Sequence, residues 1–323
     1  MANISLKMAM LFVAAALSTT TVYAGSPTQV SLVVNPHPDD EMEVWSLVEG
    51  SSSNYKVFMY LTRGEETGYC VTTTYNNSLR TDLGEVRPPY TPSGKWSASC
   101  VESRIASTLN FLNNMGSSDS SIPTGFVPSS YSVVSPATNG AALSHVDNGV
   151  SIADASVRVY NATNGMGKVL FFNLGDGDLT RSEVEWAIRS VKNNPSLFGI
   201  PAGLPFYNAI GSFANSMYTS CTPYSHSDHK AVHSALFSTN FGFKGYQTAA
   251  TCLTDPDVSR TKDVSTAAWD RAWKIESNYQ RTGYAQKNYG WLNNSLGGWA
   301  VGYGANQKAY TPFMQRQSFW QRF

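Results

Sequence analysis

Short apolar segments alternate with segments of helical periodicity along the first two thirds of the chain. Residues 29–34, 55–62 and 169–173 are apolar runs of the length expected for buried strands. Residues 103–115 and the segment that opens at Thr180 place apolar side chains at helical spacing. This alternation predicts an α/β fold, a Rossmann-like and mostly parallel sheet that is flanked by helices and joined by right-handed crossovers.

Local signals mark the ends of several predicted helices. Thr180 and Glu183 have the spacing of a capping box, in which each side chain bonds the backbone of the other residue. Ser225 has the same relation to Asp228 and is predicted to cap a later helix. Gly116 is the predicted stop of the helix over 103–115.

The predicted domain covers residues 25–252, and residues 253–323 form a Trp-rich C-terminal extension that we expect to pack on the same domain. Such a segment can contribute to the core or present aromatic rings to a sugar, and the sequence favours the core. Its tryptophans are Trp269, Trp273, Trp291, Trp299 and Trp320.

Residues 1–24 have the pattern of a signal peptide. One lysine precedes an apolar run over 8–17, and small residues stand at the positions that determine cleavage after Ala24. The apolar run is too short to span a bilayer, so a stable membrane anchor is the less favoured alternative. We expect a secreted or periplasmic protein.

The four cysteines support export. Cys70, Cys100, Cys221 and Cys252 allow three disulfide pairings, and neighbours in sequence would close two loops of about thirty residues. A cysteine metal site is disfavoured because no pair has the short spacing typical of such sites.

The charge balance argues against a nucleic-acid partner. Lysines and arginines number 23, as do aspartates and glutamates, whereas nucleic-acid binding favours a basic surface. No protein partner is evident.

Two distant segments combine histidines with carboxylates. His37-Pro-Asp-Asp-Glu follows the first strand, and His226-Ser-Asp-His229 lies much later. Together they offer the nitrogen and oxygen donors that Zn²⁺ prefers, with carboxylate left over to act as a base. His229 and His233 could instead form an i, i+4 metal pair, but His37 would then lack a role. His145 is assigned to a loop.

These two blocks resemble those of the PIG-L/LmbE-like family of zinc-dependent de-N-acetylases. The family places an Ala/Pro-His-Pro-Asp-Asp-Glu segment at the end of the first strand and a His-Pro-Asp-His segment downstream. The first block is complete here, and Ser227 replaces the proline of the second. The resemblance covers roughly residues 28–240.

The resemblance implies a ligand set and a base. His37, Asp40 and His229 correspond to the metal ligands, and Zn²⁺ is the implied cofactor. Asp39 corresponds to the general base that takes a proton from the attacking water.

The resemblance also implies roles for residues around the metal. His226 would face the developing oxyanion and protonate the leaving amine, with Asp228 orienting it. Tyr224 would help to polarise the carbonyl. Asp176 would contact sugar hydroxyls, and Arg63 is the second predicted substrate-binding residue.

One family feature is missing. An Arg-x-x-Glu pair is expected where Glu102 stands, but Ser99 occupies the place of the arginine. Arg63, Arg87 and Arg104 are the candidates to orient the substrate in its stead.

The predicted function is that of an exported, zinc-dependent N-deacetylase acting on an N-acetylated amino sugar or glycoconjugate. A non-catalytic, metal-dependent carbohydrate-binding protein and a deacylase of a non-sugar amide are the alternatives. Asp39 favours an enzyme, because a binding protein has no need of a base beside the metal.

Overall fold

A computed structural model describes residues 25–67, 70, 94–129, 132–134, 145–147, 150–152, 155–212, 226–251, 259–273, 284–289 and 316–323. The predicted signal peptide, Tyr224, Arg87, Cys221 and Cys252 lie outside these residues. The predictions that concern them therefore stay predictions.

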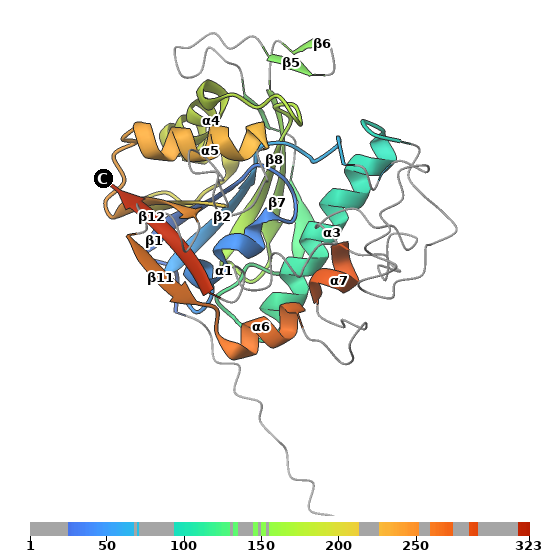
Figure 1. Ribbon diagram of the computed structural model, residues 1–323. Helices are drawn as coiled ribbons and strands as arrows, with labels where there is room; N and C mark the ends of the chain where they lie inside the picture. The colour runs from blue at the N-terminus through green and yellow to red at the C-terminus, as the bar shows by residue number, and fades with distance from the viewer. Residues whose placement is uncertain are drawn as a thin grey trace, which may run out of the picture.

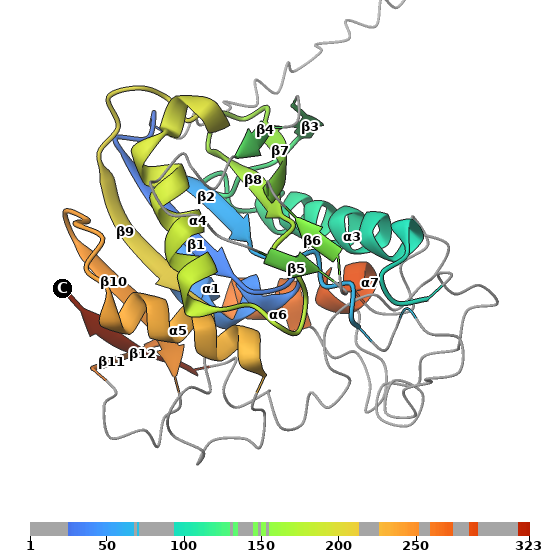
Figure 2. The same ribbon diagram turned by 90° about the horizontal axis from the view of Figure 1, so that it is seen from above.

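Within the described residues, ten strands form one mixed sheet in the order β11-β12-β10-β9-β1-β2-β8-β7-β3, with β4 also paired to β7 (Figures 1 and 2). The strands of this sheet are β1 (Gln29–Asn35), β2 (Asn54–Tyr60), β3 (Phe126–Pro128), β4 (Ser132–Val134), β7 (Ala155–Ala162), β8 (Gly167–Phe172), β9 (Phe206–Gly211), β10 (Tyr246–Thr251), β11 (Arg260–Asp263) and β12 (Arg316–Arg322). A separate hairpin joins β5 (His145–Asp147) to β6 (Val150–Ile152).

The sheet is parallel only at its centre. Strands β10, β9, β1, β2 and β8 pair in parallel, whereas β11 and β12 on one side and β3, β4 and β7 on the other add antiparallel pairs. The four residues 163–166 between β7 and β8 are too few for the crossover that a parallel pair requires, so these strands form a hairpin. The prediction of an α/β fold is confirmed, but that of a mostly parallel sheet is not.

Helices cover both faces of the sheet (Figure 1). One face packs against α4 (Arg181–Asn193) and α5 (Ser227–Ser238), and the short helix η4 (Pro195–Phe198) follows α4. The other face packs against α1 (Trp45–Val48), α3 (Ala98–Gly116), α6 (Thr266–Trp273) and α7 (Tyr284–Tyr289). Side chains of the central strands alternate between these two buried cores, as expected for a sheet that is covered on both sides.

The local signals at the helix ends are mostly accurate. Thr180 and Glu183 form the predicted capping box, with the Thr180 N–H donating to Glu183 Oε2 at 2.7 Å. Helix α3 ends at Gly116 but begins five residues before Ser103, because the Ser97 hydroxyl caps it by accepting from the Cys100 N–H. His226, one residue after the predicted Ser225, occupies the N-cap of α5.

The C-terminal extension adds strands β11 and β12 to the main sheet. Strand β12 pairs with β10 and β11, and Trp320 on β12 is buried against Phe237 and His233. Trp269 is partly buried against the core. Trp269 and Trp320 therefore serve packing.

One predicted disulfide is present. Cys70 and Cys100 are bonded and tie the chain near the end of β2 to the first turn of α3. Among the residues described, no helix has the length and apolar character needed to cross a bilayer.

Candidate metal centre

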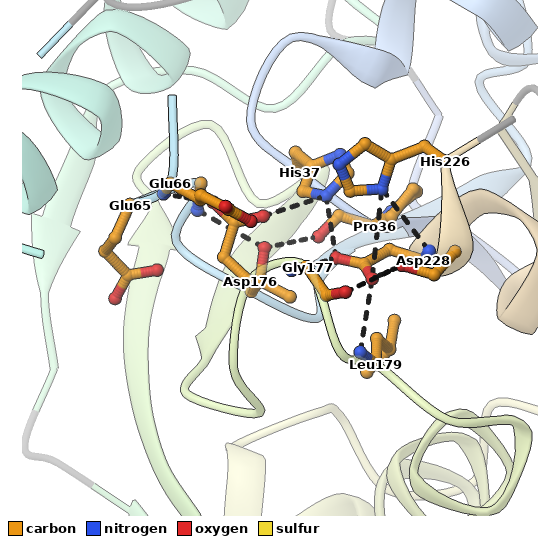
Figure 3. Close-up of polar contacts among 12 residues, drawn as sticks. Pro36, His37, Glu65, Glu66, Asp176, Gly177, Leu179, His226 and Asp228 are labelled. Atoms are coloured by element: carbon orange, nitrogen blue, oxygen red, sulfur yellow. Dashed lines mark hydrogen bonds and ion pairs between the residues drawn. The ribbon is translucent and has the colours of Figure 1, made fainter. Parts of the chain in front are cut away.

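The predicted site residues that the structure describes converge at the carboxyl ends of the parallel strands, where functional groups collect in α/β sheets. His37 follows β1, and Asp176 follows β8. His226 and His229 come from the start of α5, which packs against β1 and β9. Figure 3 shows His37 between the loop that carries Asp176 and the first residues of α5.

The predicted ligands His37, Asp40 and His229 form a buried group in which one ligand atom of each lies within 4.8 Å of the others. The Nδ1 atom of His37 lies 3.1 Å from Asp40 Oδ2. His229 Nε2 lies 3.5 Å from the other oxygen of Asp40. The backbone N–H of His37 donates to Asp40 Oδ2 at 2.9 Å, a bond that holds the Asp40 carboxylate against the start of the first histidine block.

A second group surrounds the other ring nitrogen of His37. His37 Nε2 lies 2.9 Å from Asp228 Oδ2 and 3.1 Å from Asp176 Oδ1. The ring of His226 stands 4.7 Å from the His37 ring, with 28% of its side chain exposed. This group too could hold a cation by its donor types and spacing.

The carboxylates of the second group already accept backbone hydrogen bonds. The N–H groups of Gly177 and Leu179 donate to Asp228 at 2.9 and 3.1 Å, and the Glu66 N–H donates to Asp176 at 2.5 Å (Figure 3). These bonds leave Asp176 and Asp228 suited to orient His37. The group of His37, Asp40 and His229 offers two imidazoles and one carboxylate, the donor set of many zinc sites.

The electrostatics of His37 agree with this division. Burial disfavours its charged form, but the contacts with Asp176, Asp228 and Asp40 outweigh burial and raise its pKa well above the usual value. Both ring nitrogens face carboxylate oxygens, which favours the protonated ring. A cation that bound at Nδ1 would displace the proton from this atom. Metal binding would then release a proton, as is expected for a histidine ligand.

The carboxylates respond to the same contacts. Burial opposes ionisation of Asp40, but His229 and His37 outweigh it and lower its pKa. For Asp228, contact with His37 overcomes burial and brings the pKa to about 2. The pKa of Asp176 is also lowered, since His37 outweighs the effect of burial.

Asp39 lies beside this group in an unusual backbone conformation, with a φ of 101°. Burial raises the pKa of its carboxyl group to about 8, against the opposing charge of Arg104. A cation near the carboxylate lowers such a pKa. A cation bound beside Asp39 would therefore favour its ionised form.

The structure separates the arginine candidates. Arg104 Nη2 donates to the Pro38 carbonyl at 2.6 Å and lies 3.6 Å from Asp39 Oδ1. Arg63 instead bonds Glu65 at 2.7 Å and also Asn173. Of the two described candidates, Arg104 is the one in contact with the first histidine block.

Two residues gained importance only from the structure. Glu41 is fully buried and accepts from two tyrosine hydroxyls, and burial raises its pKa to about 7. One of these tyrosines, Tyr289, lies 248 residues away and carries no local pattern that links it to the block. His233, the alternative ligand, packs against Phe237 and Trp320.

No protein-family model, curated protein or solved structure matches the chain. The chemistry of the site itself is therefore the basis for inferring its function.

Proposed function

We propose that this chain is an exported, zinc-dependent amide hydrolase that removes an acetyl group from an N-acetylated amino sugar or glycoconjugate. The resemblance of its two blocks to the PIG-L/LmbE-like de-N-acetylases suggests the reaction and the sugar. We further propose that the five parallel strands are the Rossmann-like part of the fold and that residues 1–24 direct export.

A single observation carries the proposal. Residues 37 and 229 come from distant parts of the chain, yet His37, Asp40 and His229 lie in one buried group with Asp39 adjacent in sequence. Two imidazoles and one carboxylate suit Zn²⁺ and leave the ion a net positive charge. When bound, zinc supplies a Lewis acid that polarises a carbonyl and makes water acidic near neutral pH.

The chain's own groups supply the proton transfers. Asp39 accepts the proton that a water molecule loses as its oxygen forms a bond to the amide carbon. His226, whose side chain is 28% exposed, donates a proton to the nitrogen as the C–N bond breaks, which yields acetate and the free amine. Asp228 and Asp176 hold His37 through its Nε2 atom.

Asp39→Asn tests this proposal against binding without turnover. We expect the variant to retain zinc and to lose acetate release by about 10²–10⁴-fold over a panel of N-acetylated amino sugars, the usual contribution of general-base catalysis. Asp263→Asn is the control, because Asp263 is an exposed residue on β11. Equal turnover in wild type and Asp39→Asn would remove Asp39 from the mechanism, and sugar binding without acetate release by wild type would favour a binding protein.

A further inference from the structure

Glu41, a carboxylate of the first block, belongs to neither candidate metal group and, unlike Asp39, has no role in the proposed proton transfers. Its side chain is fully buried and accepts three hydrogen bonds. The Asp39 N–H donates to Oε2 at 3.1 Å, the Tyr60 hydroxyl donates to Oε2 at 3.0 Å, and the Tyr289 hydroxyl donates to Oε1 at 2.6 Å. Both oxygens of a carboxylate can accept in this way, so Glu41 joins three separate elements.

The first of these bonds acts on a strained residue. Asp39 has a positive φ, which residues with a side chain rarely adopt and which persists only where surrounding contacts impose it. Glu41 holds the N–H of Asp39, and Arg104 holds the carbonyl of Pro38 on the other side of the same peptide bond. Rotation of this peptide away from the observed conformation would break both contacts.

The two tyrosines are themselves fixed. Tyr60, on β2, is fully buried and stacks on Phe171 with ring centroids 4.9 Å apart. Tyr289, on α7, is also fully buried, packs on Phe111 and lies 3.1 Å from Thr108 Oγ1. Their hydroxyl groups therefore define where the Glu41 carboxylate must lie.

We propose that Glu41, held by Tyr60 and Tyr289, is a positioning residue that fixes the backbone of Asp39 so that its carboxylate stays beside His37 and Asp40. The catalytic part of this inference rests on the proposed role of Asp39 as the base. Because Tyr289 belongs to residues 253–323, the C-terminal extension contributes to the site without touching the reacting atoms.

The test compares Tyr289→Phe and Glu41→Gln with the wild-type chain. Tyr289→Phe removes one donor and keeps the ring, and it provides the test if Glu41→Gln does not fold. Tyr55→Phe is the matched control, because Tyr55 is a buried tyrosine on the same strand as Tyr60 but packs in the core on the opposite face. The measurements are the exchange rate of the Asp39 amide hydrogen, the zinc content, kcat and KM.

We expect both variants to exchange the Asp39 amide about tenfold faster and to keep their zinc. We expect kcat to fall by about three- to tenfold in Tyr289→Phe and by about 10–100-fold in Glu41→Gln, with KM within about twofold, because small displacements of a catalytic group have effects of this size. Tyr55→Phe should match wild type in exchange and in kcat.

Unchanged exchange at Asp39 in both variants would overturn the proposal, whatever happens to activity. Loss of zinc from the folded variants would also overturn it, since Glu41 would then act on the metal ligands. If wild type releases no acetate, the proposed function fails, while the exchange rates still decide whether Glu41 and Tyr289 hold Asp39.

Discussion

Replacing Asp228 with asparagine tests how His37 is held. Each oxygen of Asp228 accepts a backbone hydrogen bond: Oδ1 from Leu179 and Oδ2 from Gly177. Oδ2 also lies 2.9 Å from His37 Nε2. An asparagine has one acceptor oxygen, so its NH₂ group must face a donor in either orientation.

The size of the effect follows from these contacts. The side chain of Asp228 is fully buried, and a buried donor left without its acceptor costs about 1–3 kcal/mol in the free energy of unfolding. If the asparagine keeps the bond to Leu179, His37 Nε2 loses the nearer of its two carboxylate partners and keeps only Asp176, 3.1 Å away. Loss of such a partner lowers metal affinity by about 10–100-fold, or about 1.4–2.7 kcal/mol.

Two assays separate these effects. Urea unfolding of the metal-free chain measures the change in stability, and competition with a zinc chelator measures the change in affinity. Asp119→Asn is the control. Each oxygen of Asp119 accepts one backbone N–H, from Gly50 and from Ser121. Asp119 is distant in sequence from both histidine blocks. It should lose stability and keep its zinc affinity. If Asp228→Asn kept wild-type zinc affinity and lost only turnover, Asp228 would act on His226 and not on His37.

Two further predictions concern buried groups away from the ligands. Burial lowers the pKa of Lys56 and of Lys168 to about 8. The unfolded chain keeps these protons up to about pH 10, so it binds more protons than the folded chain between pH 8 and 10. The free energy of unfolding should therefore rise over this range, by about 1–3 kcal/mol per lysine. Urea unfolding across this range should show the rise, and the double change to methionine should flatten it; an unaltered slope would contradict the assignment. Gly64→Ala places a methyl group against the guanidinium of Arg104 and should lower both stability and turnover. Gly50→Ala, which has the same sign of φ and open space around it, should cost only about 1 kcal/mol for its backbone, and equal effects of the two changes on turnover would refute a role for the Arg104 contact.

Sequence signals were accurate where the physical cause is local. The capping box at Thr180 depends on residues three positions apart, and it forms as predicted. The apolar run before His37 is a strand buried in the centre of the sheet. The first histidine block was predicted to follow this strand directly, and it does, at the carboxyl end where functional groups collect. The pairing of the two blocks in one site was expected only from the family resemblance.

The sequence was less informative where partners are distant. Asp228 was expected to orient His226, its near neighbour, yet its closer histidine contact is to His37, 2.9 Å away against 3.8 Å for His226. The antiparallel strands β7, β11 and β12 were not predicted, because polar residues interrupt them and leave no apolar run. The contact of Tyr289 with Glu41 leaves no periodic pattern, since it depends on how α7 packs against α3.

The arrangement around His37 makes the two histidine blocks depend on each other. An imidazole whose Nε2–H donates to a carboxylate presents Nδ1 to a metal in a fixed direction. The second block supplies both that carboxylate, Asp228, and a ligand, His229, while the first supplies His37 and Asp40. Asp228 and His229 are adjacent at the start of α5. Any shift of this helix end would therefore change the orientation of His37 and the position of His229 together. The backbone bonds from Gly177 and Leu179 to Asp228 oppose such a shift, so the loop after β8 is part of the candidate metal centre.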